Sequence, residues 1–156
     1  PEAAQVRRIG DARPKQDLPI AGKPMMFSSI EALAGVSRFV CVSVVLSPLD
    51  RHWGQHDWSA FPEKIEPIFA GGVLRADTVR NALAHLASRL AKDDWGLVHD
   101  AARPCVTTEL VEQVLDAVGD DPVGGLLATP LAAPLKRPAE NQRGAMLPSR
   151  RVGNCR

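Results

Sequence analysis

Phe39-Val40-Cys41-Val42-Ser43-Val44-Val45-Leu46 is the stretch of sequence that decides the fold. It is a nearly continuous run of apolar and β-branched residues of strand length, and Ser47-Pro48 ends it. Such a run is typical of a strand that is buried on both faces, as in a parallel sheet covered by helices. We therefore expect residues 39–46 to form an interior strand, with Cys41 as buried apolar filling.

Helix-like and strand-like segments alternate on both sides of this run. The spacing of apolar residues and the positions of Pro, Gly and Thr predict helices at residues 23–34, 76–90 and 108–118. Short apolar runs predict further strands at residues 65–70, 95–98 and 123–129. Because strands and helices follow one another in turn, the sequence predicts an α/β fold, with a mainly parallel sheet and helices on both faces.

Length and composition are those of one soluble globular domain. The chain has 156 residues, of which 45% are hydrophobic and 24% charged, and its net charge is +1. A charge this small gives no field that would attract nucleic acid or an anionic membrane, so we expect neither partner. The sequence shows no apolar stretch of membrane-spanning length and no signal-peptide pattern, so the cytoplasm is the expected compartment. The three cysteines form no CxxC pair, which indicates neither a disulfide framework nor zinc.

The composition changes toward the end of the chain. Residues 1–129 carry the alternating elements, whereas from about Pro134 onward Pro, Gly and Arg replace any regular period. We therefore expect a core over residues 1–129 and an arm or an irregular tail over residues 130–156.

A candidate site follows the predicted strand 95–98, in the sequence Val98-His99-Asp100-Ala101-Ala102-Arg103-Pro104. Ligands of parallel α/β sheets bind at the carboxyl ends of the strands. At such a place the Asp100 carboxylate suits a Mg²⁺ ion that also touches a phosphate, and Arg103 suits the phosphate itself. The alternative is a solvated Asp/Arg turn without a ligand.

The first third of the chain holds a cluster of cations. They lie in Arg7-Arg8, in Arg13-Pro14-Lys15-Gln16 and in Gly22-Lys23-Pro24. Such a loop-rich stretch can surround a triphosphate with positive charge and backbone N–H groups. Surface loops are often basic, so a solvated loop is the alternative.

Three blocks of the sequence, taken together, resemble one enzyme family. They read Pro14-Lys15-Gln16-x-Leu18-Pro19-x-x-Gly22-Lys23-Pro24, Gly71-Gly72-x-x-Arg75-x-Asp77-Thr78-Val79 and His99-Asp100-Ala101-Ala102-Arg103-Pro104-Cys105, and Leu135-Lys136-Arg137 resembles a fourth. The blocks occur in the order and with the spacing of one family. On this basis the chain from Pro1 to about Arg137 resembles 2-C-methyl-D-erythritol 4-phosphate cytidylyltransferase of the bacterial non-mevalonate isoprenoid pathway. The resemblance implies a Rossmann-like nucleotidyltransferase that joins CTP to methylerythritol phosphate with the help of Mg²⁺ and releases pyrophosphate.

The resemblance also implies roles for single residues. Arg8 and Lys15 match the residues that hold the triphosphate and stabilise the transition state. Asp100 matches the Mg²⁺-binding carboxylate and Arg103 a contact to the acceptor phosphate, while His99 is expected to be a positioned neighbour of Asp100 rather than a base. The expected nucleotide-binding residues are Ala3, Ala4, Gly72, Thr78 and Asp100, of which Gly72 and Thr78 match cytosine contacts.

The same resemblance implies an assembly. In the family, the segment after the last core strand crosses to a partner subunit and completes its acceptor site. We therefore expect a two-fold homodimer, built through residues 130–156, in which Lys136 and Arg137 face the acceptor phosphate of the neighbour.

The chain departs from the family pattern at four positions. Ala4 and Val6 occupy glycine positions of the first loop, Val73 replaces an Asp and Pro134 replaces a Thr. The family's first strand and last third have no counterpart in the sequence, so we expect an incomplete or divergent family member. Two alternatives stay open: another sugar- or polyol-phosphate nucleotidylyltransferase, and a catalytically silent nucleotide-binding or oligomer-forming protein.

Overall fold

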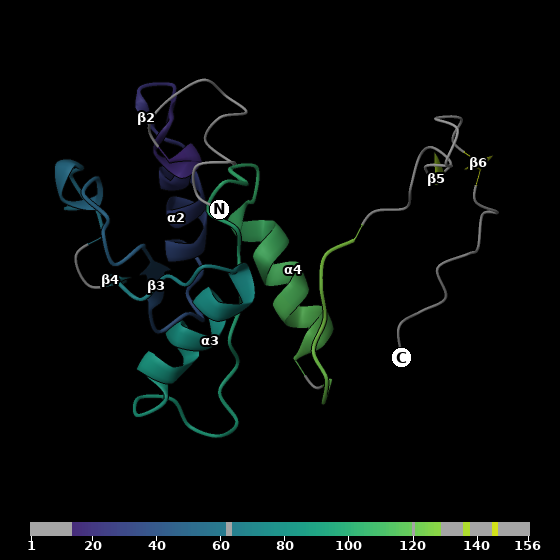
Figure 1. The fold of residues 1–156 in the computed structure, drawn as a ribbon. Coiled ribbons are helices and arrows are strands. Elements are labelled where there is room, and N and C mark those ends of the chain that lie inside the picture. Colours follow the sequence, from purple (N-terminus) through teal and green to yellow (C-terminus); the bar gives the residue numbers. More distant parts are fainter. Residues whose placement is uncertain (1–13, 62–63, 120, 129–135, 138–144, 147–156) are drawn as a thin grey trace. The chain divides into compact units, whose positions relative to one another are not determined.

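The computed structural model describes residues 14–61, 64–119, 121–128, 136–137 and 145–146. The chain divides into two compact units, Pro1–Gly119 and Asp120–Arg156. The first unit holds all the helices of the described part and the strands β1 to β4, and the second holds β5 and β6 (Figure 1). Within the described residues, no helix combines the length and the apolar character that crossing a bilayer requires.

A parallel pair of strands lies at the centre of the first unit. β3 (Val42–Val45) pairs with β4 (Ile65–Ile68), so that Val42 lies opposite Ile65 and Val45 opposite Ile68. The ladder continues past the strand ends, because the N–H of Leu46 donates to the carbonyl of Ile68 over 2.8 Å. Pro67, which has no N–H to donate, is exposed in β4, as an edge strand permits.

Three helices accompany this pair: α2 (Met25–Ala34), α3 (Arg75–Leu86) and α4 (Thr108–Val118). α2 begins after Pro24, whose ring fixes the backbone angle at the helix entrance. α4 is capped by Thr107, whose hydroxyl accepts the N–H of Leu110 over 3.3 Å. These helices confirm the three that the sequence predicted, with ends that differ by a few residues for α2 and α3.

Short elements precede and separate the helices. They are the 3-10 turns η1 (Lys15–Asp17) and η2 (Trp53–Gln55) and the antiparallel strands β1 (Pro19–Ile20) and β2 (Lys23–Pro24). The tight turn between β1 and β2 places both Ala21 and Gly22 at positive φ, 49° and 83°. Such a turn matches the twist of a hairpin and favours glycine.

The core of the first unit gathers around α2. α2 contacts η1, β2, β3 and α4, and it lies beside α4 in Figure 1. The buried apolar side chains come from α2 and the turn that follows it, from the carboxyl end of the parallel pair and from α4; they are Met26, Ile30, Val36, Leu46, Ile68 and Val111. Each such side chain contributes about 1.5–3 kcal/mol when it leaves water. α2 is therefore the element onto which the rest of the first unit packs.

The prediction for residues 39–46 was wrong in two respects. The strand covers Val42–Val45 and is half-buried throughout, while Val40 is 94% exposed. Cys41 is also half-buried rather than buried, and its Sγ lies 3.7 Å from Oε1 of Glu66. The physical reason is that β3 has one strand neighbour in the described residues, whereas burial on both faces requires a wider sheet with helices on both sides.

Two further strands were predicted where the structure has none. Neither 95–98 nor the described residues 123–128 form a strand, and Trp95 and Val123 are 56% and 89% exposed. An apolar run favours an extended backbone, but a strand also needs a neighbour for its N–H and C=O groups, and neither segment has one in the described part. At the start of the second segment, Asp121 Oδ1 accepts the N–H groups of Val123 and Gly124, which favours a turn.

The described residues of the second unit include one short two-stranded sheet. β5 (Lys136–Arg137) pairs antiparallel with β6 (Ala145–Met146), so that Lys136 lies opposite Met146. The segment that the sequence predicted to be an arm or an irregular tail therefore includes a short antiparallel ladder.

Candidate active site

The loop after β4 is held against the end of β3. The N–H of Gly71 donates to the carbonyl of Leu46 over 2.8 Å. A Cβ at residue 71 would lie 2.8 Å from that same carbonyl oxygen, closer than side-chain carbon atoms approach oxygen. Glycine is therefore needed for the chain to pass this close to β3.

Gly72 and Thr78 contact each other at the start of α3. The N–H of Gly72 donates to Oγ1 of Thr78 over 3.0 Å, and that hydroxyl donates to the carbonyl of Leu74 over 3.3 Å. A Cβ at residue 72 would lie 2.4 Å from Cβ of Asp77, so a side chain at this position would push the loop off the helix. The structure thus brings together the two residues predicted to contact the base, while their role toward a nucleotide stays a prediction.

The Asp100 turn, residues 99–103, is built by its own hydrogen bonds. Asp100 Oδ1 accepts the N–H of Ala102 over 3.1 Å, and the carbonyl of Asp100 accepts the N–H of Arg103 over 2.9 Å. Nε2 of His99 lies 3.1 Å from the carbonyl oxygen of Arg103. His99 therefore closes the same turn that presents Asp100.

A buried serine of α2 anchors this turn. Ser29 is 2% exposed, and its Oγ lies 3.2 Å from the carbonyl oxygen of Arg103 and 3.5 Å from that of Ala101. Sequence reasoning missed Ser29. The signal was present, because a serine three residues after Met26 lies on the apolar face of the predicted helix 23–34, where a hydroxyl needs a partner.

Two arginines flank the Asp100 carboxylate. Oδ2 of Asp100 lies 3.6 Å from Nη1 of Arg75 and 3.7 Å from Nε of Arg103. Arg75 begins α3, so this contact joins the loop after β4 to the Asp100 turn. The sequence contained Arg75 inside the Gly71–Val79 block, but nothing in that block indicated its contact with Asp100.

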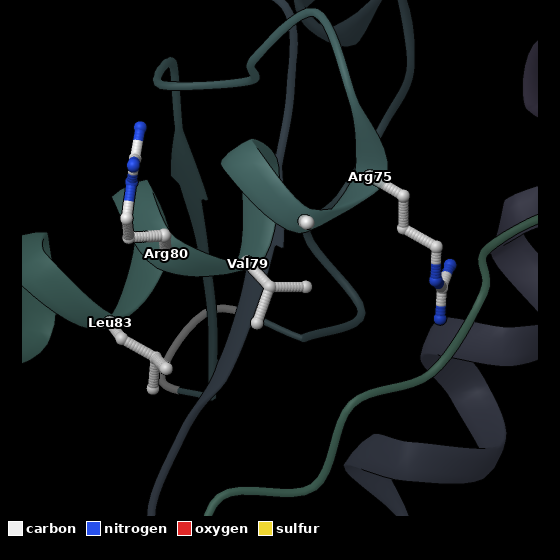
Figure 2. Close-up of a pocket in the computed structure, with 5 residues that line it drawn as sticks. Arg75, Val79, Arg80 and Leu83 are labelled. Carbon is white, nitrogen blue, oxygen red and sulfur yellow. The ribbon is translucent and has the colours of Figure 1, made fainter.

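An open hollow of about 670 Å³ lies against α3, lined by Arg75, Ala76, Val79, Arg80 and Leu83. Figure 2 shows Arg75 and Arg80 extending in opposite directions from the helix, with Val79 between them and Leu83 beyond Arg80 along the helix. No residue of α3 is buried in the described part of the chain. The apolar side of this helix therefore stays open, and Arg75 forms the end of the hollow that faces the candidate site.

Comparison with known proteins shows the family to which this chain belongs. The family described as 2-C-methyl-D-erythritol 4-phosphate cytidylyltransferase matches residues 1–151. The chain belongs to this family. The protein of that name from Nitrosomonas eutropha is 48% identical over 132 residues, which cover 83% of this chain and 57% of the relative. The one from Nitrosospira multiformis is 47% identical over 139 residues, which cover 88% of this chain and 60% of the relative.

A solved structure of the cytidylyltransferase family has the same fold. The crystal structure of 4-diphosphocytidyl-2C-methyl-D-erythritol synthase matches with a TM-score of 0.78 and 33% sequence identity, over 86% of this chain and 63% of that one. The predicted α/β fold of a Rossmann-like nucleotidyltransferase is thereby confirmed. The chain spans less than two thirds of the length of each of these three proteins.

The cytidylyltransferase residues expected from the sequence fall into three groups. Gly72, Thr78, Asp100 and Arg103 are described and lie around the start of α3 and the Asp100 turn. Lys15 is exposed in η1, and in the described residues no hydrogen bond or ion pair joins its side chain to the others. Ala3, Ala4 and Arg8 lie outside the described residues, as do Val6 and Pro134.

Proposed function

We propose that this chain carries an active site for cytidylyl transfer from CTP to 2-C-methyl-D-erythritol 4-phosphate, with release of pyrophosphate. An oxygen of the acceptor phosphate bonds to the α-phosphorus of CTP, and the bond from that phosphorus to the bridging oxygen of the β-phosphate breaks. One observation carries the proposal. In a chain of this family, Arg75 joins the loop after β4 to the Asp100 turn, which gathers a carboxylate and two guanidinium groups at one place.

The charges at this place suit reacting phosphates. Two phosphate-bearing substrates repel each other, so the site has to hold them in line and neutralise the charge that develops. The guanidinium groups of Arg75 and Arg103 lie beyond hydrogen-bond distance of Asp100 and are more than half exposed. Both are thus free to turn toward phosphate oxygens, and we assign Arg103 to the acceptor phosphate. Arg8 and Lys15 are assigned to the triphosphate, where they stabilise the transition state.

The Asp100 carboxylate fits a Mg²⁺ ion. Its side chain is 39% exposed, and the described residues contain no cluster of three His, Cys, Asp or Glu side chains that would form a closed cage. Mg²⁺ is commonly held by one carboxylate together with phosphate oxygens and water, which is the donor set available here. When bound, the ion supplies positive charge that offsets the charge of the transferring phosphate.

The loop after β4 is assigned to the cytosine base. Backbone groups of Gly72 and the hydroxyl of Thr78 are held by their mutual hydrogen bond, and Val73 between the loop's ends is 73% exposed. Gly72 and Thr78, together with the backbone of Ala3 and Ala4, are the proposed contacts to the nucleotide. Val73 lies beside the proposed base site, so it bears on which nucleotide the site selects. The alternative nucleotidylyltransferases differ from this proposal in that choice.

The assembly and the compartment belong to the same proposal. We assign residues 130–156 to an arm that completes the acceptor site of a partner subunit in a two-fold homodimer, acting in the cytoplasm. The support is the composition of this segment and the family to which the chain belongs.

Pyrophosphate release tests the function. The chain is mixed with methylerythritol phosphate, Mg²⁺ and either CTP, UTP or ATP, and pyrophosphate is measured with and without the acceptor. We expect release that depends on both CTP and the acceptor. Equal release from UTP or ATP would instead support another nucleotidylyltransferase, and CTP binding without release would support the catalytically silent protein.

A further inference from the structure

Asp17, at the end of η1, is a buried carboxylate that the proposed chemistry does not use. Its side chain is 2% exposed, and Oδ1 lies 3.8 Å from Nε2 of His56. Within the described part of the chain, neither oxygen of Asp17 nor Nε2 of His56 has a hydrogen-bond partner. Buried polar groups are almost always paired, so two that face each other at this distance require an explanation.

Aromatic rings pack against the histidine of this pair. The imidazole of His56 packs edge-on against Trp58 at 5.7 Å between ring centroids, and Trp58 stacks on Trp53 at 4.1 Å. Trp58 also stacks on Phe27 of α2 at 5.9 Å. The segment 50–61 is thereby fixed to α2, with His56 held against Asp17.

The charges that face Asp17 act in opposite directions. Burial raises the pKa of the Asp17 carboxyl above its usual value, His52 lowers it, Asp50 raises it and His56 lowers it. Asp50 is itself engaged, because its Oδ1 accepts the N–H groups of His52 and Trp53. Burial outweighs the two histidines, so the pKa of the Asp17 carboxyl is raised overall. This carboxyl therefore binds a proton more tightly than an exposed one would.

The same turn carries Lys15. The N–H of Asp17 donates to the carbonyl of Pro14 over 2.9 Å, and the N–H of Leu18 donates to that of Lys15 over 3.3 Å. The backbone of Lys15 is therefore bonded into the turn that the Asp17 side chain anchors. A movement of the buried carboxylate would shift the place from which the Lys15 side chain extends.

We propose that Asp17 and His56 bind one proton between them and that this proton fastens the Lys15–Asp17 turn to the segment 50–61. With the proton bound, the pair is neutral overall and its N–O contact closes to a hydrogen bond. Without it, one negative charge stays buried beneath the aromatic rings, which favours opening of the turn. Asp17 and His56 are thus positioning residues for Lys15, and this last step rests on the proposed function.

Two measurements test the proton and the turn without any substrate. In the full chain carrying Trp95→Phe, fluorescence reports on Trp53 and Trp58, which lie beside His56. Amide hydrogen exchange of residues 15–25, corrected for the intrinsic effect of pH, reports on the turn. When the pH is raised from about 5 to about 8, we expect a fluorescence transition, with exchange of these amides severalfold faster on its alkaline side.

Variants separate this proposal from a general effect of pH. Asp17→Asn keeps the shape and the volume but carries no charge, so it should remove both the transition and the change in exchange. His56→Gln leaves the buried carboxylate in place and removes a group that lowers its pKa, so it should move the transition to higher pH. Asp57→Asn is the matched control, because Asp57 is an exposed carboxylate next to His56, and it should leave both unchanged. A transition that persists in Asp17→Asn, or exchange that ignores the transition, would overturn the proposal.

The link to Lys15 is tested by kcat as a function of pH. The parent should lose kcat across the transition with little change in KM for the acceptor, and Asp17→Asn should lose this dependence. If the parent binds CTP without turnover, the dissociation constant of CTP is measured as a function of pH in place of kcat. If it neither binds nor turns over CTP, the proposed function fails, whereas fluorescence and exchange still decide whether the proton holds the turn.

Discussion

Ser29→Ala tests how α2 holds the Asp100 turn. The substitution removes a hydroxyl that is 2% exposed and lies 3.2 Å and 3.5 Å from two carbonyl oxygens of the turn. The lost hydrogen bond costs about 0.5–1.5 kcal/mol, and a buried acceptor left without a partner adds to that cost. Alanine favours a helix by about 0.5 kcal/mol over serine, which offsets part of the loss. Ser28→Ala has the same helix gain, and in the described residues Ser28 makes no hydrogen bond to the turn.

We expect Ser29→Ala to be less stable than Ser28→Ala by about 1–2 kcal/mol, which corresponds to about 2–8 °C in Tm for a chain of this size. Thermal unfolding of both variants, followed by circular dichroism, measures the difference. Because Arg103 and Asp100 belong to the same turn, Ser29→Ala should also lower kcat/KM more than Ser28→Ala does. Equal stability of the two variants would refute the view that Ser29 anchors the turn.

Three further changes test other parts of the account. Lys15→Ala should lower kcat by about a hundredfold and weaken CTP binding less, whereas a loss of affinity at unchanged kcat would make Lys15 a binding group alone. Asp17→Asn should stabilise the chain more at about pH 7 than at about pH 4, as measured by urea unfolding. The pKa of Asp17 is raised in the folded chain, so protonated Asp17 stabilises the parent at low pH and this stabilisation is lost as the pH rises. An Asn variant less stable than the parent at neutral pH would contradict this. Truncation after Thr129 should convert a dimer to a monomer in sedimentation, and a monomeric full chain would argue against the arm.

The sequence predicted those elements whose signal is local. α4 was predicted from its apolar spacing and a threonine cap, Thr107 or Thr108, and β4 from a short apolar run that ends before Gly71. The segment 95–98 was predicted equally firmly and is not a strand, since pairing depends on a neighbour that an apolar run does not specify.

The sequence predicted the residues of the candidate site better than the contacts between them. The motifs placed Gly72, Asp100 and Arg103 in loops and Thr78 in the first turn of a helix, and the structure confirms both. The burial of Asp17 and the contact of Arg75 with Asp100 arise from segments far apart in the chain. Such contacts are set by tertiary packing, so a single sequence does not reveal them.

The account depends most directly on Asp100. Pyrophosphate release from CTP and methylerythritol phosphate, measured for the parent chain and for Asp100→Asn beside their unfolding midpoints, tests it in one experiment. We expect the parent to release pyrophosphate only with both substrates and Mg²⁺, and Asp100→Asn to lose most of this release while it unfolds at the same midpoint. A folded parent that releases none, or an Asp100→Asn variant that keeps its release, would contradict it.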